Sequence, residues 1–209
     1  MAKRHQPRSG SLQFWPRVRA KRIYSNIKSW IKKDENKPLA FAGYKVGMTH
    51  IQTVKSGKKG VEIITTIPAT IIECPPMKSL ALRFYKNSPY GSSVISQIFS
   101  KNLDKGLSKK ISLPKKSKTE IPKYYDFIKL VVYTQPKLTG IGKKKPEIFE
   151  IPLGGDLEYA KSLLEKEIDI EDVFNNGSYT DIHGITKGHG FTGPIKRFGI
   201  SLKGHKSEK

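Results

Sequence analysis

The first 33 residues carry ten Lys or Arg and no Asp or Glu, and the first acidic residue is Asp34. Four large aromatic residues lie among these cations: Phe14, Trp15, Tyr24 and Trp30. Such a segment cannot bury enough apolar surface to fold alone, and its like charges repel one another. Because cations neutralise phosphates and flat rings stack on bases, the segment is predicted to bind nucleic acid. A disordered, solvated tail is the competing interpretation, which the four large aromatics disfavour.

The whole chain has the same bias, with 39 Lys and Arg against 18 Asp and Glu and a formal charge of +21 at pH 7. A surplus of this size destabilises a compact chain unless an anionic partner offsets it. RNA, DNA and an anionic membrane surface are the candidates. A membrane is disfavoured, because no apolar stretch approaches the roughly 20 residues that span a bilayer, and no secretory signal begins the chain. A transit peptide would also be basic, but it should be Ser-rich and amphipathic.

The residue types that carry catalysis form no familiar pattern. Cys74 is the only cysteine, which excludes a disulfide within the chain and a thiolate metal site. The five histidines show no zinc spacing, and neither a nucleophile elbow nor a Walker loop is present. The sequence therefore predicts a protein that is not an enzyme, has no metal or cofactor, and works in a reducing, cytoplasmic setting.

The first half of the chain has strand composition. Residues 38–54 are predicted to form two short strands around a turn, and residues 79–86 a further strand. Residues 61–73 are rich in Ile, Val and Thr, but Pro68 implies an edge strand, a bulge or two strands. Four or five strands at this spacing predict a small barrel or sandwich.

The middle of the chain differs in composition. Eight lysines and only two acids in residues 101–123 indicate an insertion, preceded by a possible helix near 94–103. Strands are predicted at 127–134 and at 147–153.

The clearest predicted helix covers residues 156–168, where Asp156 is a good N-cap and apolar residues recur at helical spacing. Nine of the 18 acids lie between Glu147 and Asp172. This cluster is interpreted as a solvated face rather than an active site. The molecule is then polarised, with one face that binds RNA and another that faces solvent or a protein neighbour.

Gly188, Gly190 and Gly193 spell G-x-G-x-x-G near the C-terminus. A dinucleotide site is disfavoured, because the motif needs a βαβ unit and Pro194 with basic residues follows it instead. Glycines also let a backbone lie close against another surface. Neighbouring side chains would then reach phosphate or 2′-hydroxyl groups or stack on bases: Lys187, His189, Phe191, Lys196, Arg197 and Phe198. A Gly-rich surface loop with incidental charge is the alternative.

Residues 181–199, DIHGITKGHGFTGPIKRFG, closely resemble a signature of the universal large-subunit ribosomal protein L-three family. Other blocks resemble that family in the same order: PRSGSLQFWPR at 7–17, typical of its archaeal and eukaryotic branch, FAGYKVGMTH at 41–50, ECPPM at 73–77 and IEDVF at 170–174. Several blocks in order are more specific than any one of them. The resemblance covers nearly the whole chain and is loosest in the lysine-rich middle.

The resemblance implies a mainly β protein: a translation-factor-like β-barrel with an α/β insertion and an extended basic N-terminal arm. The expected ranges are 1–37 for the arm, 38–90 for the first part of the barrel, 91–177 for the inserted α/β domain, and 178–209 for the return to the barrel and the root of a central finger loop. Family members continue past the position of Lys209, so the barrel is expected to be incomplete here.

The function that the resemblance implies is that of a structural constituent of the large ribosomal subunit. It would bind large-subunit rRNA, support assembly and the region near the peptidyl-transferase centre, and contact neighbouring ribosomal proteins, without a membrane or a small-molecule substrate. The candidate RNA-binding residues are Lys3, Arg4, Arg8, Trp15, Arg17, Arg19, Lys21, Arg22, Lys45, Lys187, His189, Lys196, Arg197, Lys203, His205 and Lys206. Two alternatives stay open: an RNA-modifying or translation-factor-like enzyme on a related barrel, and a DNA-binding chromatin protein.

Overall fold

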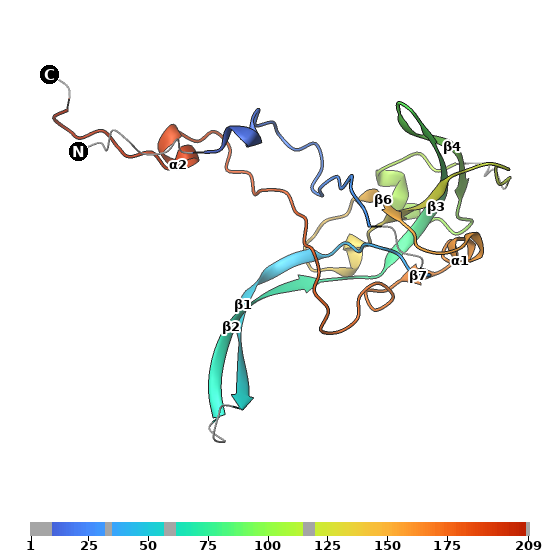
Figure 1. Ribbon diagram of the computed structural model, residues 1–209, viewed down its shortest axis with the longest axis horizontal. Helices are drawn as coiled ribbons and strands as arrows, with labels where there is room; N and C mark the ends of the chain where they lie inside the picture. The colour runs from blue at the N-terminus through green and yellow to red at the C-terminus, as the bar shows by residue number, and fades with distance from the viewer. Residues whose placement is uncertain (1–9, 32–34, 57–61, 115–119, 208–209) are drawn as a thin grey trace. The chain divides into compact units, whose positions relative to one another are not determined.

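The structure is a computed structural model that describes residues 10–31, 35–56, 62–114 and 120–207 (Figure 1). The chain divides into two compact units. Unit 1 joins the two ends of the chain, Met1–Ser29 and Tyr179–Lys209, and unit 2 is the continuous segment Trp30–Ser178. Each unit is described by itself.

Unit 2 is built on an antiparallel five-stranded sheet. Its strands are β3 (Met77–Ser88), β4 (Gly91–Phe99), β5 (Phe127–Tyr133), β6 (Ile148–Pro152) and β7 (Glu167–Ile168). The strand order is β4-β3-β5-β6, and β7 pairs with the first residues of β3. The chain therefore returns from the last part of unit 2 to the central strand of the sheet.

Alternating side chains of this sheet pack into a core on each face. Leu82, Leu130 and Ile151 lie opposite one another on β3, β5 and β6, and all three are fully buried. With Phe84 they belong to the larger core, which also includes buried side chains from the segment after β6. The other face buries Leu107 of the short helix η3 (Lys105–Lys109). Because both faces are covered, Leu80–Leu82 of β3 and Leu130–Val132 of β5 are buried and apolar without alternation.

One helix packs on the larger core. Helix α1 (Leu157–Ser162) begins after Asp156, which has extended backbone dihedrals as an N-cap does. Ala160 and Leu163 at its end are buried. Gly155 just before it has φ +84°, and a Cβ there would fall 1.6 Å from Oδ1 of Asn36, so this position requires glycine.

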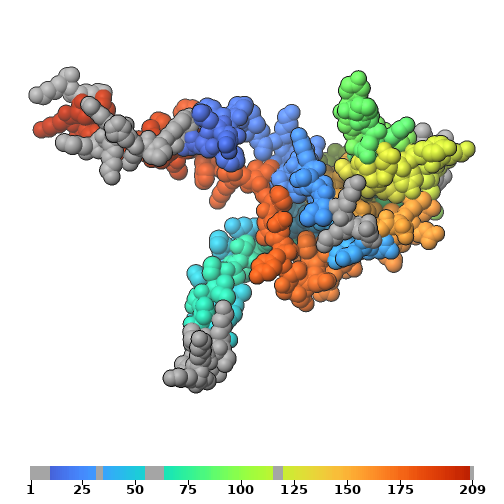
Figure 2. All heavy atoms as spheres, viewed as in Figure 1, coloured from blue at the N-terminus to red at the C-terminus, as the bar shows by residue number. Residues whose placement is uncertain are grey.

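A second, two-stranded sheet of unit 2 is the hairpin β1 (Tyr44–Ser56) and β2 (Glu62–Glu73). Its pairing runs in one register from Gly47↔Ile71 to Ser56↔Glu62, and the atoms form a narrow ribbon (Figures 1 and 2). Both of its strands are edges, which confirms an edge strand for Pro68. Its exposed apolar side chains are Val46, Met48, Ile51, Val54, Ile64, Ile67, Ile71 and Ile72.

Several predicted elements have different bounds in the structure. Residues 38–54 do not form two strands around a turn, because β1 is continuous from Tyr44 and only a bulge interrupts its pairing between Lys45 and Gly47. The helix predicted near 94–103 is wrong, since Val94 and Phe99 pair with β3 as part of β4. Apolar residues at 94, 95, 98 and 99 have helical spacing, but pairing with the central strand decides the outcome.

The helix predicted at 156–168 ends early. Helix α1 stops at Ser162, and Ile168 instead pairs with Met77 in β7. The predicted strands at 79–86, 127–134 and 147–153 are confirmed, as β3, β5 and β6.

The fold is mainly β, as predicted. Two separate sheets account for the described strands, and neither sheet is closed into a barrel. The four expected ranges stay predictions; the division that the structure shows lies at Trp30 and Tyr179. Among the described residues, no helix has the length and apolar character that crossing a membrane requires.

Candidate nucleic-acid interface

Unit 1 has little regular structure in residues 10–29 and 179–207. A single 3₁₀ turn, η1 (Leu12–Phe14), is capped by the Ser11 side chain, whose Oγ accepts the Gln13 N–H at 3.2 Å. Helix α2 (Pro194–Phe198) begins with Pro194 at its first position and ends at Gly199, which has φ +64°. Proline at the start and glycine just past the end are favoured helix boundaries. The sequence analysis missed this helix, although these two residues signal it.

The described part of unit 1 is strongly basic. It contains ten Lys or Arg and one acid, Asp181, and every one of these cations is exposed. The ten are Arg17, Arg19, Lys21, Arg22, Lys28, Lys187, Lys196, Arg197, Lys203 and Lys206. Lys203 aside, none of them forms an ion pair with a carboxylate of the described residues. Their charge is therefore left for a partner outside this part of the chain.

Three of these cations contact aromatic rings rather than acids: Arg17, Arg22 and Arg197. The rings of Trp15 and Phe198 stack with centroids 6.1 Å apart and planes inclined by 10°. The Cζ atom of Arg17 lies 5.0 Å from the centroid of the Phe198 ring, and that of Arg197 lies 5.3 Å from it. Gly10 also approaches this ring, since a Cβ at that position would lie 3.2 Å from Cδ1 of Phe198. The structure thus brings together three predicted site residues: Trp15, Arg17 and Arg197.

The other predicted site residues fall into three groups. Lys3, Arg4 and Arg8 lie outside the described residues. Those that lie exposed along the two segments of unit 1 are Arg19, Lys21, Arg22, Lys187, His189, Lys196, Lys203, His205 and Lys206. Arg22 contacts an aromatic ring of its own, with Cζ 5.7 Å from the Tyr24 centroid. Lys45 is exposed on β1 in unit 2. RNA binding by all of these residues stays a prediction.

The contacts of Phe198 were not predicted from the sequence. This residue was expected only to stack or pack, whereas it contacts Trp15, Arg17 and Arg197 at once. Gly10, the glycine beside its ring, has φ +80°, a conformation that favours glycine. No spacing rule in the sequence links positions 10 and 198, so the pairing could not be found from either segment alone.

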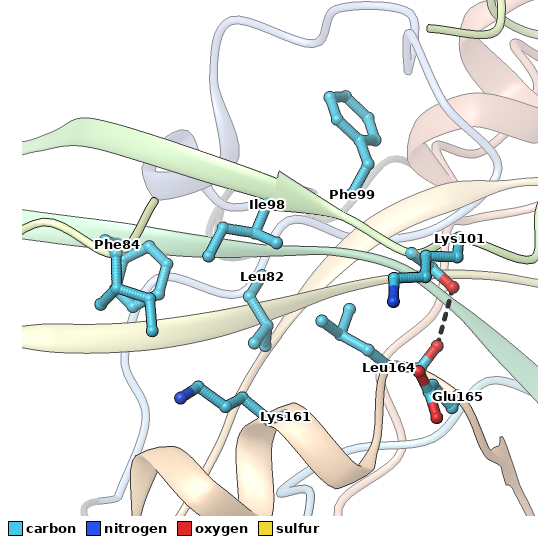
Figure 3. Close-up of a pocket in the computed structure, with 10 residues that line it drawn as sticks. Leu82, Phe84, Ile98, Phe99, Lys101, Lys161, Leu164 and Glu165 are labelled. Carbon is cyan, nitrogen blue, oxygen red and sulfur yellow. Dashed lines mark hydrogen bonds between the residues drawn. The ribbon is translucent and has the colours of Figure 1, made fainter. Parts of the chain in front are cut away.

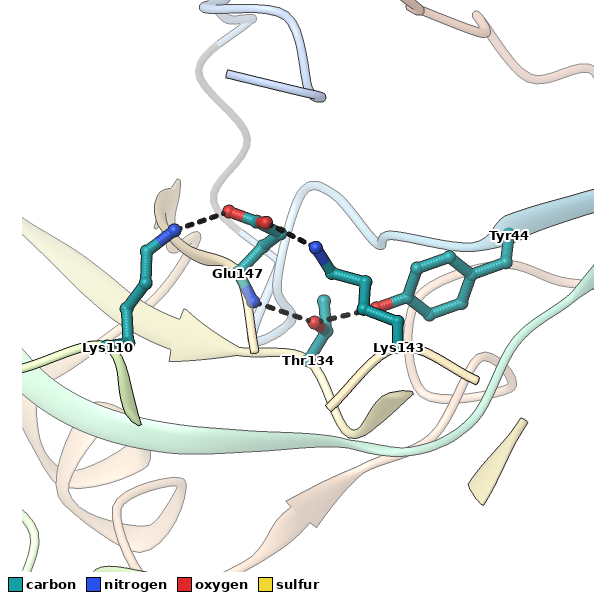
Figure 4. A network of polar contacts seen from close by, with 5 residues as sticks. All are labelled: Tyr44, Lys110, Thr134, Lys143 and Glu147. Atoms are coloured by element: carbon teal, nitrogen blue, oxygen red, sulfur yellow. Dashed lines mark hydrogen bonds and ion pairs between the residues drawn. The ribbon is translucent and has the colours of Figure 1, made fainter. Parts of the chain in front are cut away.

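Six cations of the described part of unit 2 have carboxylate partners, and Figure 4 shows two of them at Glu147. This carboxylate is 8% exposed and accepts hydrogen bonds from Nζ of Lys110 and Nζ of Lys143, each at 2.8 Å. The Glu147 N–H donates to Oγ1 of Thr134 at 3.1 Å, and the Tyr44 hydroxyl donates to the same oxygen at 2.9 Å. Burial raises the pKa of Glu147, but the two lysines outweigh it and hold the pKa below its ordinary value.

A second carboxylate of the predicted acidic face is also paired. Glu150 on β6 forms ion pairs with Arg83 and Lys129 and accepts the Tyr85 hydroxyl at 2.7 Å. Burial, with the Glu150 hydrogen bond, raises the pKa of Tyr85 to about 12. The prediction of a solvated acidic face is therefore wrong for Glu147 and Glu150, because they neutralise lysines and arginines beside the sheet. The other seven acids of that cluster are exposed, as predicted.

Unit 2 also has an open hollow of about 310 Å³ between the β3–β4 edge and α1 (Figure 3). Leu82, Phe84 and Ile98 line its floor, while Lys161 and Glu165 lie at its side. These residues belong to the edge of the larger core and include no nucleophile–base pair. Among the described residues, no group of three or more His, Cys, Asp or Glu side chains is placed to hold a metal ion.

Comparisons with known proteins identify relatives along the whole chain. The family model described as "Ribosomal protein L3" matches residues 1–119 and 106–209. The large ribosomal subunit protein uL3 of Methanosphaera stadtmanae is 43% identical over 97% of this chain and 65% of its own length. That of Archaeoglobus fulgidus is 42% identical over 95% of this chain and 64% of its length, and that of Nanoarchaeum equitans is 44% identical over 99% and 66%. The chain thus spans 64–66% of these three relatives.

Proposed function

Because the chain belongs to the Ribosomal protein L3 family, we propose that it is a structural constituent of the large ribosomal subunit that binds large-subunit rRNA. It acts in the cytoplasm, supports assembly of the subunit and the region near its peptidyl-transferase centre, and contacts neighbouring ribosomal proteins. It performs no catalysis and needs no cofactor or small-molecule substrate.

The observation that carries this proposal is the charge of unit 1. The described part of unit 1 has ten exposed cations against a single acid, in segments with hardly any regular structure, which suits a surface that lies along a phosphate backbone. Each cation that neutralises a phosphate releases condensed counterions, which is favourable at low salt. A-form RNA offers a shallow minor groove, so recognition rests on backbone shape more than on base edges.

The translation-factor-like barrel is part of the same proposal. The β1–β2 hairpin supports it, because an isolated two-stranded ribbon is marginal in water and this one exposes apolar side chains along its length. Such faces are stable when further strands or other chains cover them. The division of the chain at 1–37, 38–90, 91–177 and 178–209 is proposed on the family resemblance alone.

The enzyme alternative has no support in the names of the relatives. The DNA-binding alternative differs from the proposal in one measurable respect. A protein that recognises A-form RNA should bind rRNA more tightly than duplex DNA of equal length at the same salt concentration. Equal affinities for the two would favour the DNA-binding alternative.

Sedimentation tests the ribosomal role most directly. A tagged copy of the chain expressed in an archaeal host should travel with the large subunit through a sucrose gradient and stay there after a high-salt wash. The control is a variant in which Arg17, Arg19, Lys21 and Arg22 are all changed to Ala, and it should shift toward the top of the gradient. A wild-type chain that sediments alone at low salt would contradict the proposal.

A further inference from the structure

Phe198 is the point where the two basic segments of unit 1 meet. Its ring is stacked on Trp15 from the N-terminal segment, and the guanidinium groups of Arg17 and Arg197 lie 5.0 and 5.3 Å from its centroid. Arg17 comes from one end of the chain and Arg197 from the other, so a single ring holds a cation from each segment. Both arginines are exposed, and neither guanidinium forms an ion pair or a hydrogen bond with the described residues.

A guanidinium group held over an aromatic ring keeps its binding capacity. The ring attracts the cation through its quadrupole, while the five N–H donors lie in the guanidinium plane and remain available. These donors match the oxygens of a phosphate, which arginine binds in a bidentate manner. A carboxylate partner would instead occupy the donors and cancel the charge. The use of a ring in place of an acid thus orients the two arginines without neutralising them.

We propose that Phe198 is a positioning residue for RNA binding: stacked on Trp15, it holds Arg17 and Arg197 together so that they bind the phosphates of an RNA strand as one unit. The proposal rests on the proposed function and adds a specific device to it. It also explains why the two ends of the chain form one compact unit in which no described residue is buried. The contacts of the ring hold the two segments together, as an apolar core would do in a larger unit.

Gly10 is the second part of this device. With φ +80° it has a backbone conformation that side chains disfavour, and a Cβ would lie 3.2 Å from Cδ1 of Phe198 and 3.7 Å from Nη2 of Arg17. A side chain at this position would therefore push the ring or the arginine aside. Gly10→Ala should weaken RNA binding although it removes no charge.

The test measures binding of the full 209-residue chain to an in vitro transcript of archaeal large-subunit rRNA over a range of salt concentrations. Phe198→Ala should weaken binding about fivefold to twentyfold, the loss expected for two exposed cation–π contacts. Its log–log salt slope should become less steep by up to about two phosphates, each worth roughly 0.7–0.9. Phe198→Leu, which keeps apolar bulk without a ring, should behave like Phe198→Ala, whereas Phe198→Tyr should bind like the wild type.

A role in positioning is separated from simple packing by combining variants. In the double variant Arg17→Ala with Arg197→Ala, adding Phe198→Ala should weaken binding less than twofold, because no arginine is left to position. Tyr179→Ala is the matched control, since Tyr179 is an aromatic residue of the same segment with its side chain fully exposed. Circular dichroism of each variant should match the wild type, because the sheet of unit 2 lacks these residues.

Two results would overturn the inference while leaving the proposed function intact: full affinity in Phe198→Leu, or an undiminished effect of Phe198→Ala when both arginines are absent. A wild-type chain whose affinity for the transcript does not change with salt would instead refute the proposed function itself.

Discussion

Several cations of unit 2 contact carboxylates of the same chain, whereas three arginines of unit 1 lie over aromatic rings instead. Lys110 and Lys143 share the carboxylate of Glu147, while Arg17 and Arg197 share the ring of Phe198. Both arrangements fix long, flexible side chains. Only the carboxylate neutralises the cations that it contacts, so the charges of Lys110 and Lys143 are offset within the chain and those of Arg17 and Arg197 are not.

The two units also differ in what holds them together. Unit 2 buries a core on both faces of its sheet, with Leu82 and Leu130 fully inaccessible. In residues 10–29 and 179–207 no residue is buried. Because burial of apolar surface is the main favourable term in folding, we expect unit 2 to be stable by itself and unit 1 to need a partner.

The largest expected effect is on hydrogen exchange with and without RNA. In the free chain, amides of β3 and β5 should exchange at the rate of global unfolding, while amides of residues 10–29 and 179–207 should exchange nearly as fast as in an unstructured peptide. Adding an rRNA transcript should slow exchange in unit 1 by about tenfold or more and leave β3 and β5 unchanged. Mass spectrometry of peptic fragments measures this. Strong protection of unit 1 in the free chain would show that the two units do not differ in stability.

The next largest effect is expected from the core of unit 2. Phe84 is fully buried and its ring meets Tyr125 edge-on at 5.1 Å, so Phe84→Ala should lower the free energy of unfolding by about 3–5 kcal/mol. The salt slope of RNA binding, measured below the melting temperature, should not change. Tyr90→Ala is the control, because Tyr90 is fully exposed and should cost less than about 0.5 kcal/mol. Urea denaturation followed by circular dichroism gives both values.

A smaller effect is expected from the internal counter-charge. Glu147→Gln keeps the shape of the side chain but leaves Lys110 and Lys143 without their shared anion, which should lower the free energy of unfolding by about 1–2 kcal/mol. Glu165→Gln changes an exposed acid without an ion pair among the described residues and should stay within about 0.5 kcal/mol. Equal stabilities of the two variants would show that the pairing in unit 2 contributes nothing.

The smallest effect is a dependence on alkaline pH. The folded-state pKa of Tyr85, about 12, exceeds the ordinary value of 10, so its contribution to stability is complete below pH 10 and is lost as the pH rises toward 12. The loss should reach about 1 kcal/mol by pH 10.5. Tyr133 also has a raised pKa, from burial and the nearby Asp104, so Tyr85→Phe is needed as the reference. The stability difference between Tyr85→Phe and the wild type should shrink over this range; a constant difference would exclude Tyr85 as the cause.

The sequence predicted what depends on local pattern. The run at 127–134 is apolar and β-branched, and it forms β5 within one residue. The acid-free first 33 residues predict a segment without an apolar core, and no residue of 10–29 is buried, while its binding to nucleic acid stays a prediction. Contacts between remote residues decide the remainder. The residues of β4 have helical spacing but pair with β3, and the sequence around Glu147 and Phe198 does not show that each also holds a remote cation, Lys110 and Arg17 respectively.

The stack of Trp15 on Phe198 has a consequence for the timing of synthesis, because its two members stand near opposite ends of the chain. During synthesis Trp15 and Arg17 leave the exit tunnel early, and they cannot contact Phe198 until that residue has also been made. At about 5–20 residues per second, that delay lasts roughly ten seconds or more. During that time the acid-free N-terminal segment is accessible to any RNA nearby. A newly synthesised chain therefore needs either rapid transfer to its own RNA or temporary binding by an acidic protein.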